Sequence, residues 1–236
     1  MTNHLANISG AILAGGLGTR LRDRVWDRPK VLADVDGRPY VTHLLDQLVD
    51  AGLSHVVLLT GYMGDMVRET LGETYAGLRL VYSCEPSPLG TAGALRLALP
   101  LLTSPATLLL NGDSYCDVSL AMFWDFHSTN AAPASLVLTW VDDTARFGRV
   151  HCEQERVVCF EEKRAGGAGW INAGVYLLSR NLIEDIPVQT PVSLERDFLP
   201  SVASHGCLCG FQTIGRFLDI GTPESYSMAG QFFRAA

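Results

Sequence analysis

The sequence lacks a long apolar run, an excess of positive charge and a paired-cysteine motif. No uninterrupted apolar run approaches the roughly 20 residues that a membrane-spanning helix needs, so we expect no membrane span. The apolar run at 8–13 is short, follows uncharged residues and leads into a glycine-rich turn, which argues against a signal peptide. These absences predict a cytoplasmic protein that does not act at a membrane.

Positive charge is scarce, because 18 Lys and Arg residues stand against 25 Asp and Glu, a formal net charge of −7. Neutralising many nucleic-acid phosphates requires a basic surface, so we expect no nucleic-acid partner, and any phosphate site must be local. The six cysteines contain no CxxC pair, so we interpret them as reduced core residues rather than disulfides or zinc ligands.

The length and composition fit an ordinary globular protein. At 236 residues, with 47% hydrophobic and 18% charged residues, the chain fits one large α/β domain, and two small domains are the alternative. No repeat or long Pro/Ser linker marks a boundary. Apolar runs alternate with amphipathic stretches, which predicts an α/β fold: a mainly parallel, mixed central sheet flanked by helices.

The expected elements follow from apolar spacing and turn residues. In the first half we predict strands over 9–14, 55–60, 78–83 and 106–110, and helices over 40–51, 64–71 and 91–99. In the second half we predict strands over 134–141, 149–152, 157–161 and 173–178, and helices near 194–204 and 223–235. The second half should cover or extend the sheet.

A glycine-rich loop follows the first strand. The glycines of Gly15-Gly-Leu-Gly18 let the backbone turn sharply and bring several N–H groups close to an anion. The spacing fits neither the P-loop nor the dinucleotide fingerprint, and taken alone such a loop is equally well a structural turn. The cations Arg20 and Lys30 favour a site for a polyphosphate.

With these residues the sequence resembles the nucleoside-diphosphate-sugar pyrophosphorylases, whose signature is Gly-Gly-x-Gly-Thr-Arg-Leu followed by Pro-Lys. The resemblance continues through 85–93, 111–113, 147–149, 161–163, 172–174 and 219–223, and so spans almost the whole chain. It implies a Rossmann-like nucleotidyltransferase domain over 1–236, with an NTP-binding half at about 1–130, a sugar-phosphate-binding half at about 131–236 and no C-terminal β-helix domain.

The resemblance also assigns roles to individual residues. It implies catalytic roles for Arg20, Lys30, Asp113 and Lys163. It implies nucleotide binding by Leu13, Ala14, Gly15, Gly16, Gly18, Thr19, Arg20, Glu85, Pro88, Gly90, Thr91, Asn111 and Gly112. It implies sugar-phosphate binding by Gly148, Glu162, Lys163, Asn172 and Gly174. For Lys163 the alternative is a solvated lysine in a surface ion pair.

Two aspartates are candidate metal ligands. Asp113 follows a predicted strand and Asp219 ends a short apolar segment. Mg²⁺ prefers one or two carboxylates together with phosphate oxygens, so this pair fits Mg²⁺ once an NTP is bound. The alternative is that each aspartate caps a helix or forms a turn. The family resemblance favours the metal.

The reaction that these parts imply is an in-line attack by the phosphate oxygen of a sugar 1-phosphate on the α-phosphorus of the NTP, with pyrophosphate leaving. Since the nucleophile is already an anion, no general base is required. Catalysis then consists of positioning and charge neutralisation.

Glu85 bears on the choice of base. Thymidylyl and uridylyl relatives commonly have Gln here, which both donates and accepts, whereas an ionised Glu only accepts. Guanine presents adjacent N1–H and N2–H donors, so Glu85 favours GTP. The alternative is that Glu85 points to solvent and that the backbone near Leu89 and Gly90 contacts the base.

The segment Ser193-Leu-Glu-Arg-Asp-Phe-Leu199 is similar to a segment of the D-glycero-D-manno-heptose 1-phosphate guanylyltransferases. The segment 85–93 is also similar to mannose 1-phosphate guanylyltransferases. Uridylyl- or thymidylyltransferases acting on N-acetylmuramate or hexose 1-phosphates are further alternatives. Arg164 departs from the common family form after the Glu-Lys pair.

Two other protein classes share this fold but differ in their site residues. A non-catalytic regulatory subunit would show a broken loop or a missing aspartate, whereas all five of the residues that it would lose are present: Arg20, Lys30, Asp113, Lys163 and Asp219. A glycosyltransferase of related fold would show an Asp-x-Asp motif, and the spacing from Asp113 to Asp117 is wrong for it. A homo-oligomer is left open.

Overall fold

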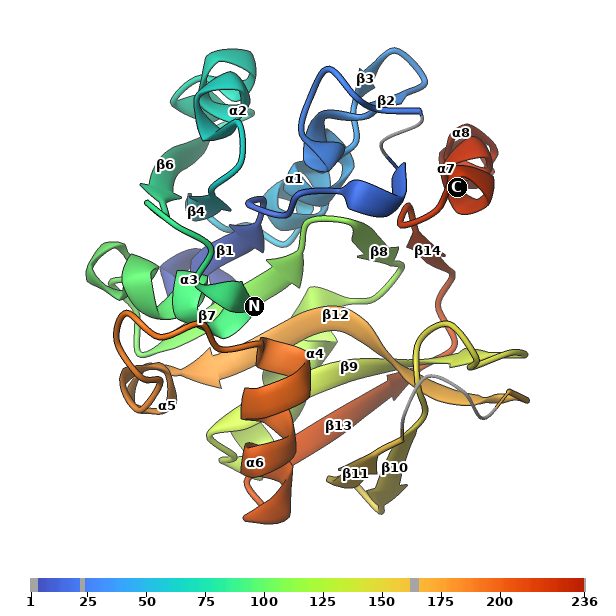
Figure 1. Cartoon of the computed structure of the whole chain (residues 1–236). Coiled ribbons are helices and arrows are strands. Elements are labelled where there is room, and N and C mark those ends of the chain that lie inside the picture. Colours follow the sequence, from blue (N-terminus) through green and yellow to red (C-terminus); the bar gives the residue numbers. More distant parts are fainter. Residues whose placement is uncertain (1–3, 22–23, 162–165, 236) are drawn as a thin grey trace.

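The computed structural model describes residues 4–21, 24–161 and 166–235. Within these ranges ten strands form one sheet in the order β10-β11-β13-β9-β12-β7-β1-β4-β6-β5 (Figure 1). The strands are β1 (Ser9–Leu13), β4 (His55–Thr60), β5 (Thr74–Tyr75), β6 (Leu78–Cys84), β7 (Ala106–Asn111), β9 (Ala134–Val141), β10 (Val150–Glu153), β11 (Arg156–Phe160), β12 (Gly169–Ser179) and β13 (Leu208–Thr213).

The strands β7, β1, β4 and β6 run parallel, and β13 runs parallel to β9. Strand β12 is antiparallel to both of its neighbours, β7 and β9, and it joins the strands of the first half to those of the second. The second half therefore extends the sheet. The expected α/β fold, with a mixed central sheet flanked by helices, is confirmed.

Two pairs of short strands lie outside the large sheet. They are β2 (Asp34–Val35) with β3 (Arg38–Pro39), and β8 (Ser114–Cys116) with β14 (Phe217–Asp219). The second pair joins the segment after β7 to a segment about 100 residues later in the chain.

Apolar residues form one core on each face of the sheet, because successive side chains of a strand point to opposite faces. In β1, Ile12 belongs to one core and Ala11 to the other. The first core is covered by α1 (Val41–Asp50), α2 (Gly64–Leu71), α4 (Leu120–Asn130) and α8 (Ala229–Arg234). The second is covered by α3 (Gly90–Ala98), α5 (Arg180–Glu184) and α6 (Leu199–Ser204). The remaining helix, α7 (Pro223–Ser227), follows β14. Within the described ranges, no helix combines the length and apolarity needed to cross a bilayer.

Several elements differ from the sequence prediction. The predicted helix at 194–204 is a π-helical turn (Leu194–Phe198) followed by α6, and the helix at 223–235 is divided into α7 and α8. The helix α4 and the strand β13 were not predicted. Apolar residues of α4 do not follow one face, and a glycine interrupts β13, so the periodic signal is weak in both.

Candidate active site

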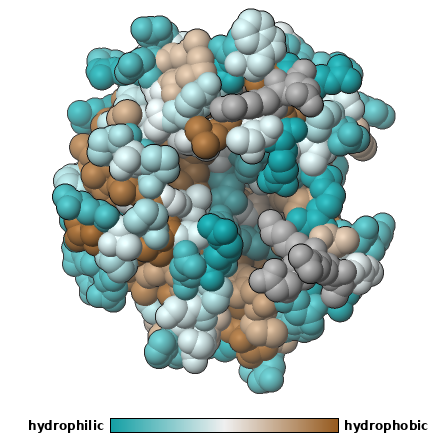
Figure 2. All heavy atoms as spheres, in the orientation of Figure 1, coloured by the Kyte–Doolittle hydropathy of each residue, from teal (hydrophilic) through white to brown (hydrophobic). Residues whose placement is uncertain are grey.

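A cleft of about 660 Å³ lies where the parallel strands of the sheet end (Figure 2). Such positions at the carboxyl ends of strands are the usual binding sites of open α/β sheets. All thirteen residues that were predicted to bind the nucleotide line this cleft, together with Lys30 and Asp113. The full lining is 13–20, Lys30, Val31, Leu59, Gly61, Tyr62, 85–88, Gly90, Thr91, Ala94, 111–113, Glu195 and Gly221.

The glycine loop approaches the neighbouring backbone closely. A Cβ atom at Gly15 would lie 3.1 Å from the backbone nitrogen of Gly61 and 3.2 Å from Glu85 Oε1. Gly18 has a positive φ of 57°, and a short 3-10 helix, Thr19–Leu21, follows it. Arg20 is exposed at the cleft and has no hydrogen bond or ion pair with any described residue. The loop therefore offers backbone N–H groups and one unpaired cation to an anion.

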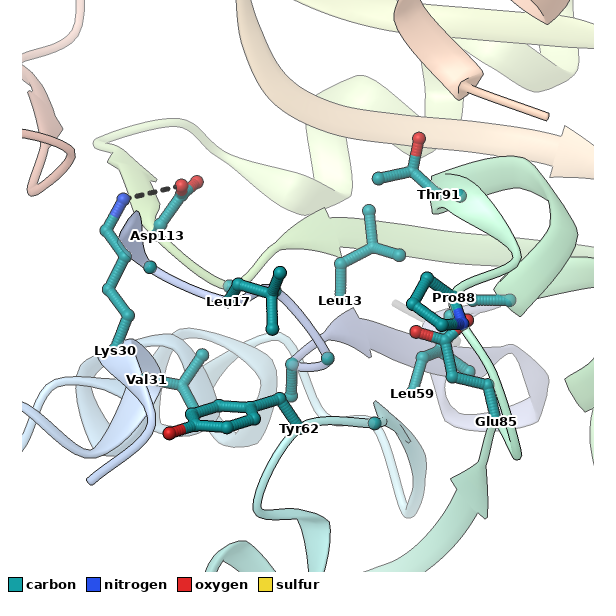
Figure 3. Close-up of a pocket in the computed structure, with 18 of the residues that line it drawn as sticks. Leu13, Leu17, Lys30, Val31, Leu59, Tyr62, Glu85, Pro88, Thr91 and Asp113 are labelled. Carbon is teal, nitrogen blue, oxygen red and sulfur yellow. Dashed lines mark hydrogen bonds and ion pairs between the residues drawn. The ribbon is translucent and has the colours of Figure 1, made fainter. Parts of the chain in front are cut away.

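Lys30 and Asp113 form an ion pair inside the cleft. Lys30 Nζ donates to Asp113 Oδ2 at 2.7 Å (Figure 3). The Lys30 side chain is 11% exposed and that of Asp113 is 35% exposed. The pair connects the segment after the glycine loop to the end of β7, so a positive and a negative group face the same ligand volume.

Asp219 lies beside Asp113 because strands β8 and β14 pair. In this ladder Asp219 is opposite Ser114, and the carbonyl of Asp113 accepts a hydrogen bond of 2.9 Å from the Ile220 N–H. Both carboxylates act on the buried Tyr40: burial raises the pKa of its hydroxyl most, and the charges of Asp113 and Asp219 raise it further. The structure thus brings together two aspartates that are distant in sequence.

The donor set suits a divalent cation only in part. Among the described residues no cluster of three or more His, Cys, Asp or Glu side chains could hold a metal ion. Asp113 and Asp219 supply two carboxylates, which is the number that Mg²⁺ uses when substrate phosphates complete its coordination. The site therefore fits a metal that binds together with a nucleotide.

Glu85 points into the cleft rather than to bulk solvent (Figure 3). Its Oε2 accepts a hydrogen bond of 2.8 Å from the Leu89 N–H, which fixes the carboxylate. Its Oε1 lies beside Gly15 and Gly61. The oxygens of an ionised carboxylate accept hydrogen bonds and cannot donate them. A ligand that donates hydrogen bonds therefore suits this wall of the cleft.

Several of the lining residues were not predicted to have a role, among them Leu17, Tyr62 and Glu195. Leu17 and Tyr62 lie near each other, beside Val31, as Figure 3 shows, and they supply apolar surface to the cleft. Glu195 Oε2 accepts hydrogen bonds from the hydroxyls of Thr91 (3.0 Å) and Ser193 (3.3 Å). The Ser-x-Glu segment was visible in the sequence, but nothing in it located Glu195 opposite Thr91.

Three of the five residues predicted to bind the sugar phosphate lie among the described residues, and none of these three lines the cleft. Gly148, Asn172 and Gly174 do not line the cleft, and Glu162 and Lys163 lie outside the described residues. Asn172 donates to Tyr176 Oη and accepts from the Gly174 N–H, both at 2.9 Å, so its amide is held within the protein. Gly174 has a φ of 77°, and a Cβ there would lie 2.9 Å from Asn111 Cβ. Its small size therefore lets β12 approach the floor of the cleft.

Asn111 is the polar residue of that floor. Its Oδ1 is buried, and it has no hydrogen-bond partner among the described residues. A buried acceptor without a partner costs free energy, so the Asn111 amide is a polar group that its described surroundings do not satisfy.

Gly90, in the wall of the cleft, packs against the backbone of Val192, and replacing Gly90 tests that contact. Gly90 has a φ of 72°, and a Cβ would lie 2.4 Å from the Val192 carbonyl oxygen. We expect Gly90→Ala to lower the free energy of unfolding by about 2–4 kcal/mol in urea titrations, through strain and overpacking. Gly206→Ala is the control, because Gly206 has a similar φ of 68° but nothing within 4 Å of a Cβ. Equal losses in both variants would contradict the contact.

A family model described as Nucleotidyl transferase matches residues 9–235. A D-glycero-alpha-D-manno-heptose 1-phosphate guanylyltransferase of Aneurinibacillus thermoaerophilus is 34% identical over 92% of this chain and 95% of its own length. A mannose-1-phosphate guanylyltransferase of Mycobacterium tuberculosis is 37% identical over 93% of this chain. The match spans only 62% of that second relative's length.

Among solved structures, HddC from Yersinia pseudotuberculosis in complex with GMP-PN is similar to this chain, with a TM-score of 0.85 and 33% identity. The match covers 96% of this chain and 99% of the HddC chain. Sequence and structure comparisons therefore agree over nearly the whole chain.

Proposed function

The chain belongs to the nucleotidyl transferase family, and from this premise we propose that it transfers the guanylyl group of GTP to D-glycero-α-D-manno-heptose 1-phosphate and releases pyrophosphate. The observation that carries the proposal is the position of Glu85, an acceptor fixed in the wall of the cleft that also holds the glycine loop and the Lys30–Asp113 pair. Support also comes from the guanylyltransferases among the relatives and from HddC, whose structure contains GMP-PN.

The residues of the cleft act by positioning and charge neutralisation. The N–H groups of Gly16 and Gly18 face the triphosphate, and Arg20 and Lys30 neutralise the charge that develops on the departing pyrophosphate. Asp113 and Asp219 would hold Mg²⁺, which neutralises phosphate oxygens when it is bound. No general base is needed, because the attacking phosphate of the sugar 1-phosphate is already an anion.

The base is recognised through hydrogen-bond donors. With Oε2 fixed by the Leu89 N–H, the remaining lone pairs of Glu85 accept from N1–H and N2–H of guanine. Uracil and thymine present carbonyl oxygens on both sides of their single N–H, and these would face the negative charge of Glu85. Selectivity therefore comes from repulsion of the wrong base as well as from attraction of the right one.

A comparison of nucleotides tests the base. With saturating sugar 1-phosphate and Mg²⁺, kcat/KM for GTP should exceed that for UTP, dTTP, CTP and ATP by about 10- to 100-fold, the value of one charge-assisted hydrogen-bond pair. Pyrophosphate release is the measurement. A preference for UTP or dTTP would overturn the guanylyl assignment while leaving the nucleotidyltransferase class intact.

The sugar is tested separately. Heptose and mannose share ring stereochemistry, so mannose 1-phosphate is the second candidate, and the relative from M. tuberculosis favours it. A panel of sugar 1-phosphates with GTP distinguishes them. The division into an NTP-binding half and a sugar-phosphate-binding half, the roles of Glu162 and Lys163, and the cytoplasmic location belong to the same proposal.

A further inference from the structure

Arg146 lies outside the sequence motifs that were assigned a role, and it contacts a proposed metal ligand. Its Nη2 lies 3.1 Å from Asp219 Oδ1. Arg146 belongs to the loop 142–149, which follows β9, whereas Asp219 ends β14. The ion pair therefore crosses from the second half of the sheet to the strand pair that carries the two aspartates.

The loop holds Arg146 in place through its backbone and through aromatic contacts, since the Arg146 guanidinium lies over the Phe147 ring, 5.2 Å from its centroid. The carbonyl of Thr144 accepts from the N–H groups of Phe147 (3.0 Å) and Gly148 (2.9 Å), which closes a tight turn. The ring of Phe147 packs edge-on against Phe217 of β14, with 5.5 Å between centroids. This contact fixes the turn beside Asp219, so Arg146 is presented to the same region whichever anion it binds.

The oxygen that Arg146 contacts, Asp219 Oδ1, has a second hydrogen-bond partner. Asp219 Oδ1 also accepts a hydrogen bond of 2.8 Å from the Gly221 N–H, and the Asp219 side chain is only 16% exposed. Arg146 thus places a positive charge against the carboxylate that would also hold a divalent cation, so the two cations compete for Asp219 through charge repulsion. Each proposed metal ligand thus has a cationic partner within the chain: Lys30 for Asp113 and Arg146 for Asp219.

The two partners differ in how easily they leave. Lys30 is 11% exposed and held at 2.7 Å, whereas Arg146 is 47% exposed. Water can solvate the half-exposed guanidinium when it leaves, whereas the mostly buried Asp219 carboxylate then needs a metal ion as its new partner. A guanidinium that is released here remains near Gly221, which lines the cleft. It can donate two parallel N–H hydrogen bonds to a phosphate.

We propose that Arg146 is a binding residue for the phosphate of the sugar 1-phosphate and that it alternates between that phosphate and Asp219. This inference rests on the proposed function, since it assumes a phosphorylated second substrate. Neither Arg146 nor Asp219 lines the cleft itself, and Gly221, whose N–H donates to Asp219 Oδ1, connects the pair to it. The pair with Asp219 neutralises the guanidinium until the metal binds Asp219 and the substrate phosphate binds Arg146.

The test uses Arg146→Gln and Arg146→Lys in the full chain. Binding of Mn²⁺ alone, measured by electron paramagnetic resonance, should tighten about two- to fivefold in Arg146→Gln, because the competing cation is gone. Binding of D-glycero-α-D-manno-heptose 1-phosphate, measured by calorimetry with Mg²⁺ and a non-hydrolysable GTP analogue, should weaken about tenfold. Arg146→Lys should lie between wild type and Arg146→Gln, and the KM for GTP should change less than about twofold.

The control is Arg68→Gln, which removes the same charge from an exposed pair with Glu73 and should change neither affinity. If Arg146→Gln bound Mn²⁺ no more tightly than wild type, or bound the heptose 1-phosphate with unchanged affinity, the proposal would be overturned. Failure of the wild type to bind the heptose 1-phosphate would count against the proposed function instead, and the Mn²⁺ comparison would still decide whether Arg146 competes for Asp219.

Discussion

Asp113→Asn is expected to lower the rate of pyrophosphate release by about 100- to 1,000-fold, the range seen when one group that stabilises charge in the transition state is removed. The substitution keeps the size of the side chain but removes the charge that pairs with Lys30 and that would hold Mg²⁺ with Asp219. Single-turnover measurements over a range of Mg²⁺ concentrations should show a weaker dependence on the metal. The fold should persist, because Asp113 is partly exposed at the cleft.

The matched control is Asp117→Asn, four residues further along. Asp117 is 53% exposed and pairs with Arg216 at 3.3 Å, outside the residues that line the cleft. It should retain turnover within about twofold of wild type, since an exposed pair contributes little. Wild-type turnover in Asp113→Asn, or an equal loss in both variants, would refute the catalytic assignment of Asp113.

The fold could be predicted where each element carries its own signal. The strand His55–Thr60 and the helix Gly64–Leu71 have the predicted bounds, because a β-branched apolar run and a helical apolar spacing are both local features. The short strands β8 and β14 carry no such signal, since three residues are too few to show a period. Their pairing is a tertiary contact, yet it is what brings Asp219 to Asp113.

The site residues that belong to a recognisable sequence motif could be predicted. The glycine loop, Lys30, Glu85 and Asn111 all line one cleft. Arg146 and Glu195 could not be located, because their partners lie 73 and 104 residues away in the sequence. Charged residues of this kind are usually solvated, and only the folded chain shows which of them face a ligand.

Glu85→Gln is expected to change the ratio of kcat/KM for GTP to that for dTTP by about 100-fold or more. Loss of the charged acceptor should weaken GTP use by about 10- to 100-fold, the value of a hydrogen bond to a charged group. A Gln at residue 85 still accepts from the Leu89 N–H through its carbonyl oxygen, and its amide group then donates toward the base. A donor in that place suits a pyrimidine carbonyl, so turnover of dTTP and UTP should rise.

Base selectivity is measured by competition, with GTP and dTTP together and the two nucleotide sugars separated by chromatography. Glu73→Gln is the control, since this substitution removes the same charge from a side chain that is 79% exposed and does not line the cleft. If the GTP to dTTP ratio of Glu85→Gln stayed near that of wild type, the backbone around Leu89 and Gly90 would be the element that selects the base. A fall in turnover for every nucleotide alike would instead make Glu85 a support of the Leu89 turn, because only a residue in contact with the base changes the ratio.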